Sequence, residues 1–375
     1  SESCTVAVSD LGHTGSGGVL TDSKSVPITV TPVNDVPSFT KGADQTVLED
    51  CGSQTVSNWA TNISAGPADE AGQTLTFTAS ASNTALFSVQ PAITSAGTLT
   101  YTPAADANGS ATITVTLKDN GGTANGGVDT SVSQTFTITV TAVNDVPSFT
   151  KGADQTVLED CGSQTVSTWA TTISAGPNNE ASQSLTFHVS NDNNALFSVQ
   201  PAITSTGTLT YTPAADANGS ATVTVYLQDS GGTANGGVDT SVSQTFTITV
   251  TAVNDVPSFT KGADQTVLED CGSQTVSTWA TTISAGPADE SGQTVDFIVT
   301  NDNNLLFSTQ PSISPAGTLT YTPAPNQNGL ATVTVRIHDN GGTANGGGDA
   351  SATQTFTITV TPVNDAPAAV VPGTS

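Results

Sequence analysis

The sequence predicts an all-β protein in which seven-stranded β-sandwiches follow one another in tandem as a linear rod. One long segment, beginning V-N-D-V-P-S-F-T-K-G at Val33, returns almost unchanged at Val143 and Val253, so the chain repeats every 110 residues. Between these copies, short stretches alternate apolar and polar residues, as strands with one buried face do. A repeat of this length can bury its own core, so we expect separate domains rather than the mutually dependent turns of a solenoid.

The first full repeat contains seven predicted strands, separated by turn signals such as N-G-G and A-G-P. Alternation is clearest in A-T-I-T-V-T-L, where Ile113, Val115 and Leu117 should face inward. Seven short alternating strands in about 100 residues favour an antiparallel sandwich with an immunoglobulin-like layout. The predicted strands cover residues 46–49, 54–63, 73–79, 86–93, 97–102, 111–117 and 134–140.

The same pattern divides the whole chain. Residues 1–35 match the last two strands of a repeat, and residues 366–375 match the start of a further repeat or supply a donor strand. Two strands cannot bury a face alone, so they are completed either by a longer array or by another copy of the chain, which would build head-to-tail filaments. The three full repeats are predicted at residues 36–145, 146–255 and 256–365.

Short proline-containing segments join the repeats. Pro37, Pro147 and Pro257 restrict the backbone of these segments, which favours a stiff connection over a flexible one. The first, second and third joints are the segments around Asn34-Asp35, Asn144-Asp145 and Asn254-Asp255.

The composition is strongly acidic, with 6 Lys plus Arg against 32 Asp plus Glu and a net charge of −26. Nucleic acids and anionic membranes require clustered basic residues, so both are excluded as partners. No apolar run reaches the roughly 18 residues that a membrane span needs. The acidity either keeps an exposed protein soluble or serves divalent cations, and the second reading requires carboxylates at fixed places.

The carboxylates do recur at fixed places. The predicted topology brings Glu49, Asp106 and Asp145 to one end of a repeat, and Glu70 and Asp119 to the opposite end. Acids that end one repeat therefore meet acids that begin the next, at a joint. Crowded carboxylates repel one another unless a cation lies between them, and Ca²⁺ prefers such all-oxygen ligands.

Each repeat resembles a cadherin repeat, in particular the bacterial cadherin-like repeats of large secreted proteins. L-F-S-V-Q-P…G-T-L-T-Y is similar to the cadherin stretch F-x-I-D-x-x-x-G-x-I, and V-N-D-V-P to the linker D-x-N-D-x-x-P. In that family calcium stiffens the joints. The leading Asp of the linker is Pro32, Ala142 or Ala252 here, which implies fewer ions per joint and weaker binding.

Carried over by position, the resemblance implies calcium ligands at each joint. The alternative is that these acids cap turns and remain solvated. The implied ligands are Asn34, Asp35, Asp69, Glu70 and Asp119 for the first joint; Glu49, Asp106, Asn144, Asp145, Glu180 and Asp229 for the second; and Glu159, Asp216, Asn254, Asp255, Asp289, Glu290 and Asp339 for the third.

The cysteines recur once per repeat. Partners a whole repeat apart cannot meet in a disulfide, so a buried or inert thiol is the simple interpretation, and an intermolecular disulfide or covalent attachment is the other. Alignment of Cys4 with the inward-facing Ile113 favours burial. The cysteines of the full repeats are Cys51, Cys161 and Cys271.

These patterns predict a non-enzymatic, extracellular rod or surface fibre that is rigidified by calcium and associates with other copies of itself or with cell-surface or matrix ligands. No G-x-S-x-G nucleophile motif or zinc-ligand spacing is present. The alternative function is a passive stalk within a large secreted enzyme or carbohydrate-binding protein.

Overall fold

The computed structural model describes residues 2–12 and 15–366. These residues divide into two compact units. One unit holds the chain up to Val146 together with residues 176–183 and 231–239, and the other holds the remainder. The structure is all-β, as the alternating pattern predicts, and its helices are single 3₁₀ turns. In the part of the chain that is described, no helix has the length and apolar character needed to cross a membrane.

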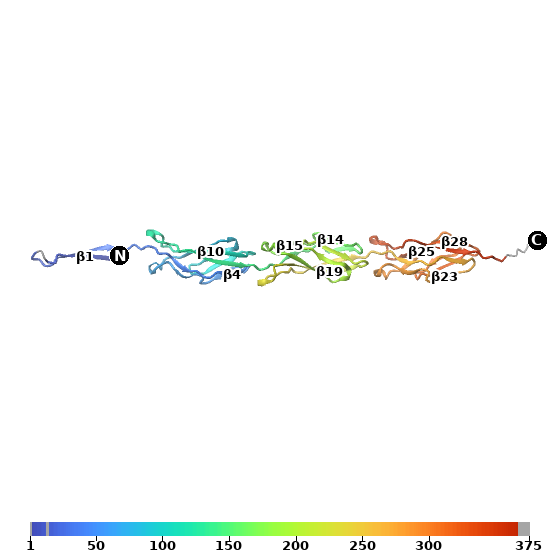
Figure 1. The fold of residues 1–375 in the computed structure, drawn as a ribbon, viewed down its shortest axis with the longest axis horizontal. Helices are drawn as coiled ribbons and strands as arrows, with labels where there is room; N and C mark the ends of the chain where they lie inside the picture. Colours follow the sequence, from blue (N-terminus) through green and yellow to red (C-terminus); the bar gives the residue numbers. More distant parts are fainter. Residues whose placement is uncertain (1, 13–14, 367–375) are drawn as a thin grey trace, which may run out of the picture. The chain divides into compact units, whose positions relative to one another are not determined.

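The first repeat is a sandwich of short strands (Figure 1). One sheet has the strand order β4-β11-β10-β7, the other has the order β5-β9-β8, and β3 pairs with β6. The strands are β3 (Ser38–Thr40), β4 (Gln45–Leu48), β5 (Gln54–Val56), β6 (Thr61–Ser64), β7 (Thr76–Ala81), β8 (Phe87–Ile93), β9 (Leu99–Pro103), β10 (Gly109–Lys118) and β11 (Gln134–Thr141).

The apolar residues of the alternating strands form the core. Ile113, Val115 and Leu117 have no exposed surface, which confirms their predicted inward orientation. Trp59 packs on Phe136 with ring centroids 4.3 Å apart, and its Nε1 donates a hydrogen bond of 3.0 Å to a backbone carbonyl oxygen. The aromatic ring thus anchors the core while its polar edge remains satisfied.

Three local features differ from the predicted strands, and the first is β3, which has no predicted counterpart. The single strand expected over residues 54–63 is two strands, because the chain turns between β5 and β6 and Asn58 adopts a left-handed φ of 55°. The pairing is also not purely antiparallel, since β4 runs parallel to β11. This parallel pairing places Glu49, directly after β4, beside the end of β11, where its backbone N–H donates to Thr141 O at 2.9 Å.

The second repeat has its own core, built from β12–β20. Its sheets have the orders β13-β20-β19-β16, β14-β18-β17 and β12-β15. The strands are β12 (Ser148–Thr150), β13 (Gln155–Leu158), β14 (Gln164–Val166), β15 (Thr171–Ser174), β16 (Leu185–Asn191), β17 (Phe197–Ile203), β18 (Leu209–Pro213), β19 (Gly219–Asp229) and β20 (Gln244–Thr251).

The third repeat has the same strand orders around a third core. Figure 1 labels β23, β25 and β28 in this repeat. The strands are β21 (Ser258–Thr260), β22 (Gln265–Leu268), β23 (Gln274–Val276), β24 (Thr281–Ser284), β25 (Val295–Asn301), β26 (Phe307–Ile313), β27 (Leu319–Pro323), β28 (Gly329–Asp339) and β29 (Gln354–Thr361).

The chain opens with a hairpin of β1 (Glu2–Ser9) and β2 (Thr21–Ile28). Both faces are exposed, and Val6 retains 54% of its accessible surface. Cys4 is also exposed, which corrects the burial expected from its alignment with Ile113, because the strands that cover Ile113 have no counterpart in the described hairpin. The cysteines of the full repeats are exposed as well, at the turns after β4, β13 and β22.

Candidate metal centre

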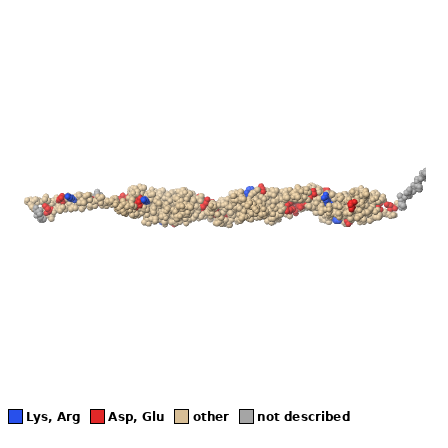
Figure 2. Space-filling model, turned by 90° about the horizontal axis from the view of Figure 1, so that it is seen from above, with Lys and Arg blue, Asp and Glu red and all other residues tan. Residues whose placement is uncertain are grey.

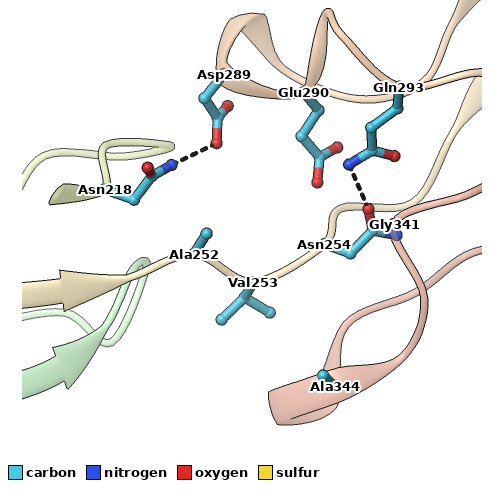
Figure 3. Close-up of a pocket in the computed structure, with 9 residues that line it drawn as sticks. All are labelled: Asn218, Ala252, Val253, Asn254, Asp289, Glu290, Gln293, Gly341 and Ala344. Atoms are coloured by element: carbon cyan, nitrogen blue, oxygen red, sulfur yellow. Dashed lines mark hydrogen bonds between the residues drawn. The ribbon is translucent and has the colours of Figure 1, made fainter.

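The third joint offers the most complete site. Asn254 follows β20 and inserts its amide into the third repeat. Its Nδ2 donates to Asp339 Oδ1 at 3.0 Å, and its Oδ1 accepts a hydrogen bond of 2.7 Å from Gln293 Nε2 (Figure 3). A Cβ on Gly341 would overlap Asn254 Oδ1, so glycine is required for this close approach. Hydrogen bonding therefore fixes the linker to the repeat that follows it.

Asp255 continues this attachment. Its backbone N–H donates to Glu290 Oε1 at 2.7 Å, and Glu290 closes the 3₁₀ turn η7 (Ala288–Glu290). Glu290 is 6% exposed and Asp339 is 1% exposed. Within the described residues, Glu290 Oε2, Asp339 Oδ2 and Asp255 Oδ2 are buried and have no hydrogen-bond donor. Buried carboxylate oxygens without partners are costly, so this cluster lacks a positive charge.

The preceding repeat contributes the other side of the joint. Carboxylate oxygens of Asp160, Asp216 and Asp255 lie within 4.8 Å of one another. Glu159, which follows β13, accepts a hydrogen bond from the backbone N–H of Val253. The structure thus brings the E-D pair after one strand and the D-A-N turn before another to the same linker.

An amide links the two sides. Asn218 Nδ2 donates to Glu159 Oε2 at 3.2 Å and to Asp289 Oδ2 at 2.9 Å (Figure 3). A cavity of about 240 Å³ opens at this place, and its lining includes Asn218, Asp289 and Glu290. None of the ion pairs among the described residues involves these carboxylates.

The crowding changes the acidity of two groups. Burial raises the pKa of Asp255, and the charges of Asp160, Asp216 and Asp289 raise it further. Burial also raises the pKa of Glu290; the backbone N–H of Asp255 opposes this rise, and neighbouring carboxylates add to it. Figure 2 shows acidic side chains gathered at a few places on a largely neutral surface, with basic side chains sparse. The local field therefore favours a cation or protons.

The second joint repeats this arrangement. Asn144 Oδ1 accepts a hydrogen bond of 2.8 Å from Gln183 Nε2, and the Asp145 N–H donates to Glu180 Oε1 at 2.9 Å. The Glu49 carboxylate accepts the Val143 N–H at 2.6 Å. Here the clustered carboxylates are Asp50, Asp106 and Asp145, again within 4.8 Å of one another.

One predicted ligand of the second joint belongs to the other compact unit. Asp229 ends β19 there and is buried, with 6% of its surface exposed. The remaining predicted ligands of this joint all lie in the unit that contains Asn144.

The first joint contains the linker residues and the carboxylates of the repeat that follows the linker. Asn34 Nδ2 donates to Asp119 Oδ1 at 3.0 Å, and the Asp35 N–H donates to Glu70 Oε1 at 2.9 Å. Asp69 lines the same cavity, of about 250 Å³, as Asn34 and Glu70. All five predicted residues of the first joint therefore lie together.

The donor set fits a hard divalent cation. Every candidate ligand atom at the third joint is a carboxylate or amide oxygen, and three of the buried carboxylate oxygens have no other partner. Ca²⁺ binds six to eight such oxygens in flexible geometry. The linker asparagines are the exception, because the Oδ1 atom of Asn254 already accepts a hydrogen bond.

Sequence reasoning missed two groups of residues. Asp50 and Asp160 stand directly after the predicted ligands Glu49 and Glu159, and their left-handed φ of 57° turns the chain at that point. The adjacent E-D pair was the available signal. Gln183 and Gln293, which hold the linker amides, gave no signal, since glutamine is common on exposed surfaces.

Two family models match parts of the chain, and one of them describes an immunoglobulin-like domain. Residues 34–131 match the model of the family described as Bacterial Ig domain, and residues 163–254 match the one described as Lipoprotein associated domain. No curated protein matches the chain.

Solved structures similar to this chain include cadherin ectodomains. Protocadherin Gamma B2 extracellular cadherin domains 1–5 match with 15% identity and a TM-score of 0.48, over 96% of this chain and 66% of that structure, just under two thirds of its length. Drosophila N-cadherin EC1-4 matches with 12% identity and a TM-score of 0.36, over 96% of this chain and 84% of that structure. Mouse Protocadherin-24 EC1-3 matches with 16% identity and a TM-score of 0.38, over 90% of this chain and all of that structure.

Proposed function

We propose that the chain is a non-enzymatic, extracellular structural or adhesive rod of cadherin-like repeats with calcium at its joints. The observation that carries the proposal is the third joint, where Glu290 Oε2 and Asp339 Oδ2 are buried without a hydrogen-bond partner. These oxygens belong to one repeat, and the clustered Asp160 and Asp216 belong to the repeat before it. A cation that binds both groups would connect two repeats.

The contacts at the third joint separate the residues that hold the linker by hydrogen bonds from the carboxylates that would bind calcium. Asn254 and Asp255 fasten the linker to the following repeat by hydrogen bonds, which need no ion. The carboxylates of Asp160 and Asp216 approach Asp255 with no cationic neighbour among the described ion pairs. Calcium would supply the missing positive charge at this point and remove the hinge freedom that carboxylate repulsion otherwise favours.

The ligands proposed for calcium at the second and third joints are the carboxylates gathered around the linker. The proposed ligands are Glu49, Asp50, Asp106, Asp145 and Glu180 at the second joint, and Glu159, Asp160, Asp216, Asp255, Asp289, Glu290 and Asp339 at the third.

The partners of such a rod would be other copies of itself or ligands of a cell surface or matrix. The exposed apolar residues of the hairpin, including Val6 and Ile28, support completion of that sheet by further strands, either from a longer array or from a second copy in a filament. The alternative is a passive stalk of a larger secreted protein, and a catalytic or carbohydrate-binding domain in the full-length protein would favour it.

Calorimetric titration of the chain with calcium tests the proposal. We expect saturable binding that Glu290→Gln weakens about tenfold or more, because affinity depends on the number of charged ligands. Asp302→Asn is the matched control: it removes one charge from an exposed residue beyond the far end of β25 and keeps the oxygen that accepts the Thr332 N–H. No binding heat, or equal affinity in Glu290→Gln and Asp302→Asn, would contradict calcium at the third joint.

A further inference from the structure

We infer that the second and third joints are not equivalent: the second is closed by hydrogen bonds without calcium, whereas the third requires the ion to close. This inference rests on the proposed calcium sites and adds to them a difference within one chain. It follows from a single position in the repeat, which is Asn179 at the second joint and Asp289 at the third.

The two joints are otherwise closely matched. Asn179 lies in the 3₁₀ turn η4 (Asn178–Glu180), and Asp289 lies at the same place in η7. The other predicted acidic ligands have an acidic counterpart 110 residues away, such as Asp145 and Asp255. The charge difference between the joints therefore comes from this one carboxylate.

At the second joint the amide of Asn179 can donate. Its Nδ2 donates to Glu49 Oε2 at 3.3 Å, and Asn108 Nδ2 donates to the same oxygen at 3.3 Å. Glu49 also accepts the Val143 N–H. The Glu49 carboxylate thus has donors from the 3₁₀ turn, from the D-A-N turn and from the linker, one more than its counterpart Glu159 has at the third joint.

At the third joint the side chain of Asp289 has no amide N–H group to donate. The single amide of Asn218 serves both Glu159 Oε2 and Asp289 Oδ2. Asp289 also adds its charge to the carboxylates that face Asp255. Among the described residues, a buried carboxylate oxygen without a partner occurs at both joints, Asp145 Oδ2 at the second and Asp255 Oδ2 at the third, so the difference between the joints lies in Asp289. Two facing carboxylates bridged by one donor repel, and a cation relieves that repulsion.

The consequence is a graded response to calcium. As calcium falls, the third joint should loosen first, while the second stays closed. A chain with both kinds of joint would bend at a defined place rather than along its whole length.

Hydrogen exchange of the full chain, with and without calcium, tests this inference. The reporters are the linker amides that bond to glutamates, Val143 and Asp145 at the second joint and Val253 and Asp255 at the third. We expect the third-joint amides to exchange about tenfold faster after chelation, the effect of roughly one lost charged contact. The second-joint amides should change less than about twofold.

Two variants exchange the Asn and Asp residues that distinguish the joints. Asp289→Asn should make the third joint insensitive to chelation, and Asn179→Asp should make the second joint sensitive. Asn178→Ala changes the neighbouring residue of η4 to the alanine that η7 carries and should leave exchange as in the parent chain. Amides of the buried core strands, such as Val225 and Val335, report that each variant is folded.

One set of results would overturn this inference alone, and another would also overturn the proposed calcium binding. An equal calcium response at both joints would overturn the inference and leave calcium binding intact. No response at either joint, together with no calcium binding by calorimetry, would overturn both. Unchanged chelator sensitivity of the third joint in Asp289→Asn would also overturn the inference.

Discussion

Asn254 Nδ2 donates a 3.0 Å hydrogen bond to Asp339 Oδ1, although the two residues are 85 positions apart in the chain. Asp339 ends β28 and is almost fully buried, while Asn254 belongs to the linker before the repeat. The contact converts the buried carboxylate into an anchor for the linker. It leaves Asp339 Oδ2 without a partner, so the same side chain is available to a cation.

A side chain at position 341 should displace the Asn254 amide and loosen the linker. In Gly341→Ala the new Cβ would overlap Asn254 Oδ1, so the linker amide must move. We expect a loss of about 1–3 kcal/mol in the stability of the third repeat, typical of overpacking, and faster exchange of the Asp255 amide. Gly292→Ala is the control, because its Cβ would meet open space. Equal effects of the two substitutions would show that Asn254 does not fasten the linker.

Much of this arrangement could be predicted from the sequence. The alternation of β10 placed Ile113, Val115 and Leu117 in the core. The seven-strand order, with acids at strand ends, also predicted that Glu49 and Asp106 lie near the linker that holds Asp145, as they do. Strand periodicity sets which end each loop reaches, and that is enough to group these residues.

The remaining features depend on tertiary contacts that no local pattern encodes. The bend at Asn58 arises because a non-glycine residue accepts a left-handed conformation. The linker amides stay predicted metal ligands, and the part that the sequence did not indicate is the hydrogen bonds from the Gln183 and Gln293 side chains to their Oδ1 atoms. Cys4 is exposed because exposure depends on strands elsewhere in the chain, not on the residue's own alternation.

The effect of pH on the stability of the third repeat should differ in sign between calcium-free and calcium-bound chains. The pKa values of Asp255 and Glu290 are raised, so the folded chain holds these protons more tightly than the unfolded chain. Without calcium, their contribution to stability is therefore greatest at low pH and is lost as the pH rises through the folded-state pKa values. With calcium, protons compete for the same oxygens and weaken binding.

Calorimetric melting of the third repeat over a series of pH values below neutrality tests this, because the pKa values of both carboxyl groups are raised. The groups that face Asp255 are Asp160, Asp216 and Asp289, and those that face Glu290 are Asp255, Asp289 and Asp339. In chelator, the melting temperature should rise as the pH falls, and the increment from added calcium should shrink. Glu290→Gln should flatten both trends. A melting temperature in chelator that falls steadily with pH would contradict the assignment.

The three cores should respond independently to substitution. Leu209 is fully buried in the core of the second repeat, which shares no residue with the other cores. Leu209→Ala should destabilise that repeat by about 2–5 kcal/mol through a cavity, and Val242→Ala, at a side chain that is 81% exposed, by less than about 0.5 kcal/mol. Hydrogen exchange should quicken in β19 and remain unchanged in β28. Equal quickening in both strands would show that the repeats unfold as one.

Small-angle X-ray scattering of the chain in calcium and in chelator tests the central proposal most directly. If calcium holds neighbouring repeats together at the carboxylates of the third joint, the maximum dimension should be larger and the chain stiffer in calcium. Chelation should then shorten the mean dimensions through bending, and Asp289→Asn should reduce that difference. Identical scattering curves with and without calcium, at concentrations that saturate binding, would contradict calcium as the element that stiffens the joints.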